Sequence, residues 1–267
     1  MNNNNPAKIY LNIAGFNIQV NLKPTEWEFA FKLKEKEIKK YWKGFITNKP
    51  EKINFTINFI ERNYLEVLYK KKEKKQYMSF FEEINSKEIN TFYQISIFQF
   101  QVILRRVISI LLAGNGFILH GSASNISGKA YAFTGDNGAG KSTTMKLLNP
   151  EYQALADDTI IIKKEKNKYY LYQTPFIEKE WWVKKSGQKL PLEKVYFLKK
   201  KKYFKEEMIK NKSLLFEKII KQFWTENDEF VPKKTKLIYQ FTHKFNYFYY
   251  LSLAKNKKKL LDFINNI

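Results

Sequence analysis

The chain has 267 residues, of which 44% are hydrophobic and 17% are aromatic. This apolar content is too high for a disordered chain, and the length suffices for one large domain or two small ones. Cysteine is absent, which excludes disulfides and thiolate metal sites and favours a reducing, cytoplasmic location. No signal peptide is visible, and the longest apolar run within a helical stretch, residues 107–113, is much shorter than a membrane span, so no membrane is expected.

The chain is strongly basic, with 48 Lys and Arg against 26 Asp and Glu and a formal net charge of +22. Such an excess favours anionic partners, for example ATP or an acidic protein. A compositional bias that places lysines on solvated faces would produce the same excess. The basic runs at residues 70–75 and 199–202 border apolar segments and belong to no recognisable nucleic-acid-reading module, so nucleic acid is not the expected partner.

The N-terminal part has the alternating pattern of β-strands. Residues 8–22 alternate on both sides of Ala14-Gly15 and predict a hairpin, and residues 53–60 and 64–69 predict a second hairpin. A charged helix is predicted over residues 27–42. We therefore expect a β-rich region over residues 1–88, followed by a second domain over residues 89–267.

The second domain is predicted to mix helices and strands. A helical pattern over residues 92–111 stops at Gly114-Asn115-Gly116. The other predicted helices cover residues 142–148, 214–224 and 257–264. The predicted strands cover residues 117–120, 130–134, 159–163, 169–173, 195–198 and 247–253, with 159–163 and 169–173 forming a hairpin.

The clearest motif begins at Gly135. The sequence Gly135-Asp136-Asn137-Gly138-Ala139-Gly140-Lys141-Ser142 satisfies the pattern G-x-x-x-x-G-K-[ST], and Thr143 follows it. A predicted strand precedes the motif and a predicted helix follows it, which is the context of a phosphate-binding P-loop. Glycines let successive backbone N–H groups point at phosphate oxygens, and the helix N-terminus adds positive charge. We therefore expect residues 135–143 to bind Mg·ATP, with Lys141 on the β- and γ-phosphates and the Ser142 hydroxyl on Mg²⁺.

The loop taken alone resembles that of an ABC transporter ATPase. Such proteins carry an LSGGQ-type signature and, well beyond the loop, an apolar strand that ends in Asp-Glu. In this chain Ser186-Gly187-Gln188 is a fragment of that signature and lies too near the loop, and no later apolar strand ends in Asp-Glu. The remainder of the sequence therefore favours another class of P-loop protein.

Two further polar features flank the P-loop. Asp157 and Asp158 follow the short helix, and an extended segment over residues 151–156 is long enough to return both carboxylates to the phosphates. One carboxylate would hold Mg²⁺, and the other would accept the proton of an acceptor hydroxyl. Taken alone, the Asp pair would only start the next strand, and His120 at the end of an apolar strand would be a hydrogen-bonded structural residue.

Three segments together resemble a known family. Leu119-His120-Gly121-Ser122-Ala123, the P-loop and Leu155-Ala156-Asp157-Asp158 resemble the HPr kinase family, which has a His-Gly ahead of its P-loop and an Ala-Asp-Asp behind it. They also resemble the nucleotide-binding half of ATP-dependent phosphoenolpyruvate carboxykinase, whose His-Cys-Ser-Ala-Asn box is similar to residues 120–125. The resemblance covers residues 116–162, and more loosely Thr174-Pro175-Phe176 and residues 191–198.

The resemblance implies an α/β fold: a P-loop core of HPr kinase/phosphoenolpyruvate carboxykinase type, with an N-terminal, mostly antiparallel β layer and a C-terminal α+β segment. It implies an ATP-dependent kinase whose acceptor is a hydroxyl, such as a Ser of a protein or peptide, although a small-molecule acceptor stays open. The implied active-site residues are His120, Lys141, Asp157 and Asp158, and Ser142 and Asp158 would contact the metal. Either Asp can be the base, and we favour Asp157. Related kinases are often oligomeric, so a homo-oligomer is also implied.

Departures from the family narrow these expectations. The Glu-x-Arg-Gly segment that follows the core of HPr kinases has no counterpart, so HPr itself is not the expected acceptor, and the basic surface would suit another acidic protein. The only arginines, Arg62, Arg105 and Arg106, lie outside the matched region, which argues against carboxykinase chemistry. The alternative function is a nucleotide-binding switch that hydrolyses ATP slowly and has no phosphoacceptor, because such a module needs only the P-loop.

Overall fold

The computed structural model describes residues 6–23, 28–62, 67–70, 75–224 and 231–266. The chain divides into two compact units, residues 1–108 and 109–267, and the division falls inside helix α2 (Ile97–Leu111). Strand β8 (Glu88–Phe92) pairs with β4 (Phe55–Ile60) and β7 (Phe81–Asn85), so the N-terminal sheet extends past residue 88, the end of the predicted β-rich region.

The first unit contains a six-stranded mixed sheet, with the order β3-β1-β2-β4-β8-β7. Strands β1 (Ala7–Ile13) and β2 (Phe16–Leu22) form the predicted hairpin, and β3 (Ile46–Thr47) pairs with β1. The predicted second hairpin is wrong, because β4 lies parallel to both β2 and β8. Alternation predicted β4 itself but carries no information about its partners. Of the predicted strand over residues 64–69, residues 64–66 lie outside the described residues, and β5 (Val67–Lys70) pairs with β6 (Lys75–Met78).

Two helices pack in the first unit, α1 (Glu28–Tyr41) and α2, with the short helix η1 (Lys43–Phe45) following α1. The ring of Phe100 on α2 lies 5.0 Å from that of Trp42 and 5.3 Å from that of Phe59 on β4, centroid to centroid. Helix α2 begins later than predicted because Ser96 and Gln99 form a capping box. The Gln99 N–H donates to the Ser96 hydroxyl at 3.2 Å, and the Ser96 N–H donates to the Gln99 side-chain oxygen at 2.7 Å.

The helical stretch Ile97–Gly114, formed by α2 and η2 (Leu112–Gly114), is long and apolar enough to cross a membrane by length and composition, with a mean hydropathy of 1.6. The apolar run over residues 107–113 did not indicate a stretch of this length, because polar residues divide the helix. Half of its length is buried within the structure, and Arg106 pairs with Glu83 at 2.7 Å. The core helix of a folded domain has the same properties, so the stretch is weak evidence for a membrane span.

The second unit contains a ten-stranded mixed sheet, with the order β12-β10-β11-β15-β14-β13-β9-β17 and with β18 pairing β15 and β16. Strand β15 joins two regions: its first residues pair antiparallel with β14, and its later residues lie parallel between β11 and β18. The predicted hairpin of β13 and β14 is confirmed. The strands are β9 (Gly116–His120), β10 (Ser122–Ile126), β11 (Lys129–Thr134), β12 (Gln153–Ala156), β13 (Thr159–Glu165), β14 (Lys168–Tyr172), β15 (Lys189–Lys200), β16 (Lys205–Met208), β17 (Phe223–Trp224) and β18 (Phe248–Leu253).

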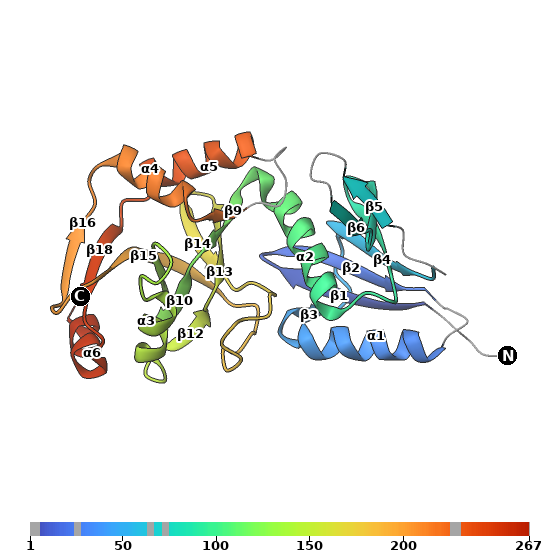
Figure 1. Ribbon diagram of the computed structural model, residues 1–267, viewed down its shortest axis with the longest axis horizontal. Helices are drawn as coiled ribbons and strands as arrows, with labels where there is room; N and C mark the ends of the chain where they lie inside the picture. The colour runs from blue at the N-terminus through green and yellow to red at the C-terminus, as the bar shows by residue number, and fades with distance from the viewer. Residues whose placement is uncertain (1–5, 24–27, 63–66, 71–74, 225–230, 267) are drawn as a thin grey trace. The chain divides into compact units, whose positions relative to one another are not determined.

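Helices cover both faces of this sheet (Figure 1). Successive side chains of β11 and β15 point to opposite faces, so each face has its own apolar core cluster for helices to pack against. Helices α3 (Lys141–Leu148) and α6 (Lys257–Asn265) pack against the cluster that contains Phe133 and Leu198. Helices α4 (Lys212–Ile220) and α5 (Val231–Lys244) pack against the cluster that contains Ala132 and Phe197. The predicted helix over residues 214–224 ends at Ile220, because Phe223 and Trp224 pair with β9, and α5 was not predicted.

Candidate functional site

The P-loop lies between the end of β11 and the start of α3. Gly135, Gly138 and Gly140 have φ values of 131°, 77° and 107°, which L side chains rarely adopt, so this backbone path requires glycine. An added Cβ at Gly135 would also lie 3.3 Å from the Cβ of Ala139. Gly140 is the N-cap of α3, and the first N–H groups of a helix have no partner within it. The loop therefore presents backbone donors at a place where an anion is favoured.

Lys141 is the first residue of α3 and is buried, with 8% of its surface exposed. Its Nζ donates to the carbonyl oxygen of Gly135 at 2.8 Å and to that of Asp136 at 3.2 Å. Burial lowers the pKa of Lys141, and the carboxylates of Asp158 and Asp136 oppose that shift. A buried ammonium is stabilised by an anionic partner, and a phosphate bound in the loop would be one.

Backbone pairing brings His120 and Asp158 together. Strands β9 and β13 are antiparallel with Thr159 opposite His120, and the N–H of Gly121 donates to the carbonyl of Asp158 at 2.9 Å. The Thr134 hydroxyl donates to the His120 carbonyl at 3.0 Å, which ties the end of β9 to the strand that precedes the P-loop. As a result, His120 Nδ1 lies 3.3 Å from Asp158 Oδ1.

Asp157 differs from Asp158 in burial. Asp157 is 3% exposed, and its Oδ1 is buried without a hydrogen-bond partner among the described residues, whereas the side chain of Asp158 is 49% exposed. An unsatisfied buried carboxylate oxygen is costly unless a ligand contacts it. Both Asp residues line a cavity of about 410 Å³, which is lined by His120, Asn137, Gly138, Gly140, Lys141, Ser142, Thr143, Asp157, Asp158, Lys179 and Lys200. The cavity thus brings together His120, the Asp pair and most of the predicted loop residues.

The remaining predicted loop residues lie elsewhere. Gly135 and Asp136 line a neighbouring cavity of about 220 Å³, and Ala139 packs against the core cluster next to α3. These residues shape the loop backbone, and the structure does not place them in the cavity that holds the Asp pair.

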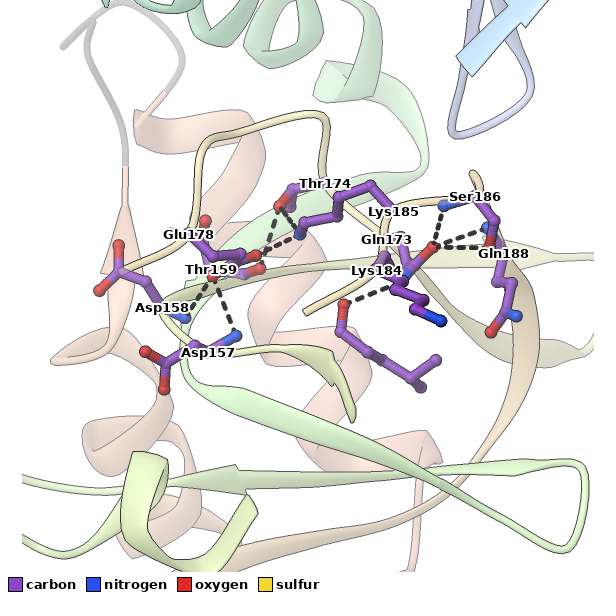
Figure 2. A network of polar contacts seen from close by, with 11 residues as sticks. Asp157, Asp158, Thr159, Gln173, Thr174, Glu178, Lys184, Lys185, Ser186 and Gln188 are labelled. Carbon is purple, nitrogen blue, oxygen red and sulfur yellow. Dashed lines mark hydrogen bonds and ion pairs between the residues drawn. The ribbon is translucent and has the colours of Figure 1, made fainter. Parts of the chain in front are cut away.

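The segment that contacts the Asp pair carries no motif that the sequence would reveal. It is the loop over residues 173–188, between β14 and β15 (Figure 2). Glu178 Oε2 accepts hydrogen bonds from the backbone N–H groups of Asp157 and Asp158, both at 3.0 Å. Glu178 Oε1 forms an ion pair with Lys185, which also donates to the Thr174 hydroxyl at 3.4 Å. The side chain of Glu178 is 3% exposed, so a buried carboxylate lies directly behind the two Asp residues.

Gln173 holds the same loop together. Its Nε2 donates to the carbonyl oxygens of Leu155 and Lys184, each at 3.0 Å. Its Oε1 accepts from the N–H groups of Ser186 at 3.0 Å and Gln188 at 3.2 Å. The Ser-Gly-Gln fragment, noted above for its likeness to a transporter signature, therefore closes this loop onto Gln173 (Figure 2).

The donor set at the cavity suits Mg²⁺. Strand β15 lies parallel to β11 and ends in Lys199 and Lys200, so the end of this neighbouring strand provides no carboxylate. The carboxylates at the cavity, Asp157 and Asp158, come from the β12–β13 turn. Among the described residues there is no group of three or more His, Cys, Asp or Glu that would hold a metal by itself. Mg²⁺ prefers oxygen ligands and commonly combines one or two protein groups with water and substrate phosphates. The Ser142 hydroxyl and the Asp carboxylates meet that requirement.

Comparison with known proteins finds one family model and a number of solved structures that are similar to this chain. The family model described as ABC transporter matches residues 122–230, which is less than half of the chain. Among solved structures, the Hpr(Ser) kinase/phosphatase from Coxiella burnetii is similar with 16% sequence identity and a TM-score of 0.26, over 34% of this chain and 72% of that chain. No curated protein matches the chain.

The residues matched by the ABC transporter model include the P-loop, the Asp pair and β15. This match does not distinguish an HPr kinase from other P-loop proteins. It agrees with the complete motif and with the strand, loop and helix that surround it in the structure. The chain therefore carries a mixed α/β domain of the P-loop NTPase type, which binds a nucleotide.

Proposed function

We propose that this domain is an ATP-dependent phosphotransferase of the HPr-kinase-like type, which transfers the γ-phosphoryl group to a hydroxyl, a Ser of a protein or peptide. The observation that supports the proposal most strongly is Asp157, whose buried Oδ1 has no partner in the part of the chain that the structure describes and which lies in the same cavity as Lys141 and Ser142. A buried oxygen costs about 1–3 kcal/mol while it has no partner, and in the proposed site the acceptor hydroxyl is the group that it contacts.

Different residues of the cavity have different roles in phosphoryl transfer. The loop N–H groups and Lys141 hold the phosphates in position, and Asp157 Oδ1 accepts the proton of the acceptor hydroxyl. The hydroxyl oxygen forms the new bond to the γ-phosphorus, the bond to the β–γ bridging oxygen breaks, and ADP leaves. Mg²⁺, when bound, neutralises charge on the phosphates, and Ser142 and Asp158 would hold it.

His120 acts on this site through Asp158. Its ring nitrogen lies 3.3 Å from the Asp158 carboxylate, and its carbonyl is tied to Thr134. His120 therefore restricts the direction in which the more exposed of the two carboxylates points.

The surroundings favour an acidic acceptor. Lys179 and Lys200 line the same cavity, and the net charge of the chain is +22. Opposite charge steers a partner to the site and raises its local concentration. The family resemblance also implies a homo-oligomer, which gel filtration with light scattering would test.

The test is incubation of the purified protein with γ-³²P-ATP, Mg²⁺ and an extract of the organism that encodes it, beside the Lys141→Ala variant. The proposal predicts label on one acceptor protein or peptide, recovered as phosphoserine and absent with the variant. If label is released only as inorganic phosphate, the protein is a nucleotide-hydrolysing switch, which the transporter-type family match would also suit.

A further inference from the structure

We propose that Glu178 is a positioning residue of this site, which fixes the turn that carries Asp157 and Asp158, and that Lys185 stabilises the buried Glu178 carboxylate. The inference rests on the proposed function, because it assigns Glu178 a role toward the same carboxylates. The experiment below reads nucleotide binding and backbone amides, so it does not depend on phosphoryl transfer.

The turn between β12 and β13 consists of the two Asp residues, since β12 ends at Ala156 and β13 begins at Thr159. Their consecutive N–H groups both donate to one oxygen of Glu178 at 3.0 Å. Figure 2 shows the Asp157 and Asp158 side chains extending away from Glu178. The two hydrogen bonds fix the backbone of the turn, and with it the Cα–Cβ bonds from which both carboxylates extend.

A carboxylate is suited to this task because hydrogen bonds to an ionised acceptor are roughly twice as strong as those between neutral groups. Burying the charge is costly unless it is paired. Lys185 provides the pair, and the Thr174 hydroxyl accepts a further bond from Lys185 at 3.4 Å. Burial lowers the pKa of Lys185, while the charges of Glu178 and Asp157 oppose that shift. The Lys185 ammonium therefore lies in the field of both carboxylates.

The loop that carries Glu178 is also attached to the P-loop helix. Glu180 pairs with Lys146 of α3 at 2.7 Å. Trp182 and Val183 pack with Met145 of α3 in a small apolar cluster. Glu178 is thus held relative to α3, and through Glu178 the Asp pair is held relative to the phosphate-binding loop.

Three variants separate the hydrogen bonds from the charge. Glu178→Ala removes the acceptor. The double variant Glu178→Gln with Lys185→Met keeps an oxygen for the two N–H groups and removes both buried charges together, so no ion is left unpaired. Glu207→Ala removes an exposed carboxylate on β16 that pairs only with Lys205 among the described residues, and it serves as the matched control.

The measurement is the affinity for ATP with Mg²⁺ and with EDTA, together with the melting temperature of each variant. We expect Glu178→Ala to bind ATP in EDTA within about twofold of the wild type, and to lose about tenfold or more of the gain that Mg²⁺ provides, as expected for removal of an outer-shell partner. The double variant and Glu207→Ala should retain most of that gain. A Glu178→Ala variant that retains the Mg²⁺ gain, or a double variant that loses as much as Glu178→Ala, would overturn the proposal.

Amide resonances separate this inference from the proposed function. In Glu178→Ala the N–H resonances of Asp157 and Asp158 should shift and exchange faster with solvent, while the double variant protects them. If the wild type gains no ATP affinity from Mg²⁺, the metal assignment in the proposed function fails, and the amides alone decide the role of Glu178. Unchanged amides in Glu178→Ala would refute it.

Discussion

Two irregular loops build the candidate site, and they do so in opposite ways. The P-loop, residues 135–143, relies on its own backbone, with glycines at positive φ and the N-terminus of α3. The loop over residues 173–188 relies on side chains, Gln173 and Glu178, which bind backbone groups of another segment. The first loop is suited to hold phosphates, and the second holds the Asp pair, which is proposed to act on them. Substitutions in the P-loop should therefore lower the affinity for ATP, whereas substitutions in the loop over residues 173–188 should lower the stability of the fold.

The largest effect is expected from the P-loop. Replacing Lys141 with Ala removes a buried cation that would bind the phosphates in the proposed site, and a hydrogen bond to a charged group contributes about 1.5–3 kcal/mol. We expect ATP affinity to fall by about 100-fold, which corresponds to roughly 2.7 kcal/mol, and phosphoryl transfer to be lost. Isothermal titration calorimetry measures the affinity, and Lys168→Ala on an exposed part of β14 is the control. Equal affinity in the wild type and Lys141→Ala would show that ATP binds elsewhere.

Asp157→Asn should affect transfer without affecting binding. The amide cannot accept the acceptor proton, so the rate of transfer should fall by about 10²- to 10⁴-fold, the usual contribution of a general base. ATP affinity should stay within a few-fold of the wild type, because the P-loop is intact. Transfer is measured with γ-³²P-ATP, and Asp262→Asn on the exposed side of α6 is the control. If transfer proceeds at the wild-type rate, another residue is the base.

Gln173→Leu tests the side-chain loop by its stability. The change keeps the volume and removes an amide that bonds to Leu155, Lys184, Ser186 and Gln188. Since Gln173 is 1% exposed, buried backbone groups lose their partners, and the free energy of unfolding should fall by about 3 kcal/mol. Urea denaturation measures this, and a fall of less than about 0.5 kcal/mol, the range of an ordinary surface substitution, would contradict it.

The smallest effects come from a pair of neighbouring tryptophans in the same loop. Trp182 packs on the cluster with Met145 of α3, whereas Trp181 is 90% exposed. Trp182→Ala should lower the free energy of unfolding by about 1–3 kcal/mol, and Trp181→Ala by no more than about 0.5 kcal/mol. Thermal or urea unfolding of both variants compares them directly. Equal losses would mean that the loop is not attached to α3 through Trp182.

The same difference between the two loops determines which site residues could be predicted from the sequence. The P-loop was predicted residue by residue, because its function depends on glycines and a lysine at fixed spacing along one segment. Glu178 gave no pattern, because it binds backbone groups of another segment and any acceptor of the right reach would serve. Lys185 gave none, because its partner Glu178 was not recognised. His120 and Asp158 were identified through a family resemblance, and the register of β9 and β13 then placed them 3.3 Å apart.

The fold shows the same contrast between local and distant information. Alternation predicted the hairpins of β1 with β2 and of β13 with β14, whose partners are neighbours in the sequence. It assigned β4 to the wrong partner, since β4 lies parallel to β2 and β8. Helix α5 was missed although Ile238 and Phe241 are buried on it, because lysines dominate its first turns. Distant pairing and burial become visible only in three dimensions.

In the proposed complex the phosphates of ATP lie in the P-loop beside the Asp pair, and this placement can be measured. It is tested most directly by backbone amide chemical shifts of the ¹⁵N-labelled protein, measured with Mg²⁺ and a non-hydrolysable ATP analogue. We expect large shifts for the amides of Gly138, Gly140, Lys141 and Ser142, and smaller ones for Asp157 and Asp158 that require Mg²⁺. Saturable binding of the analogue with no shift at these loop amides would contradict it.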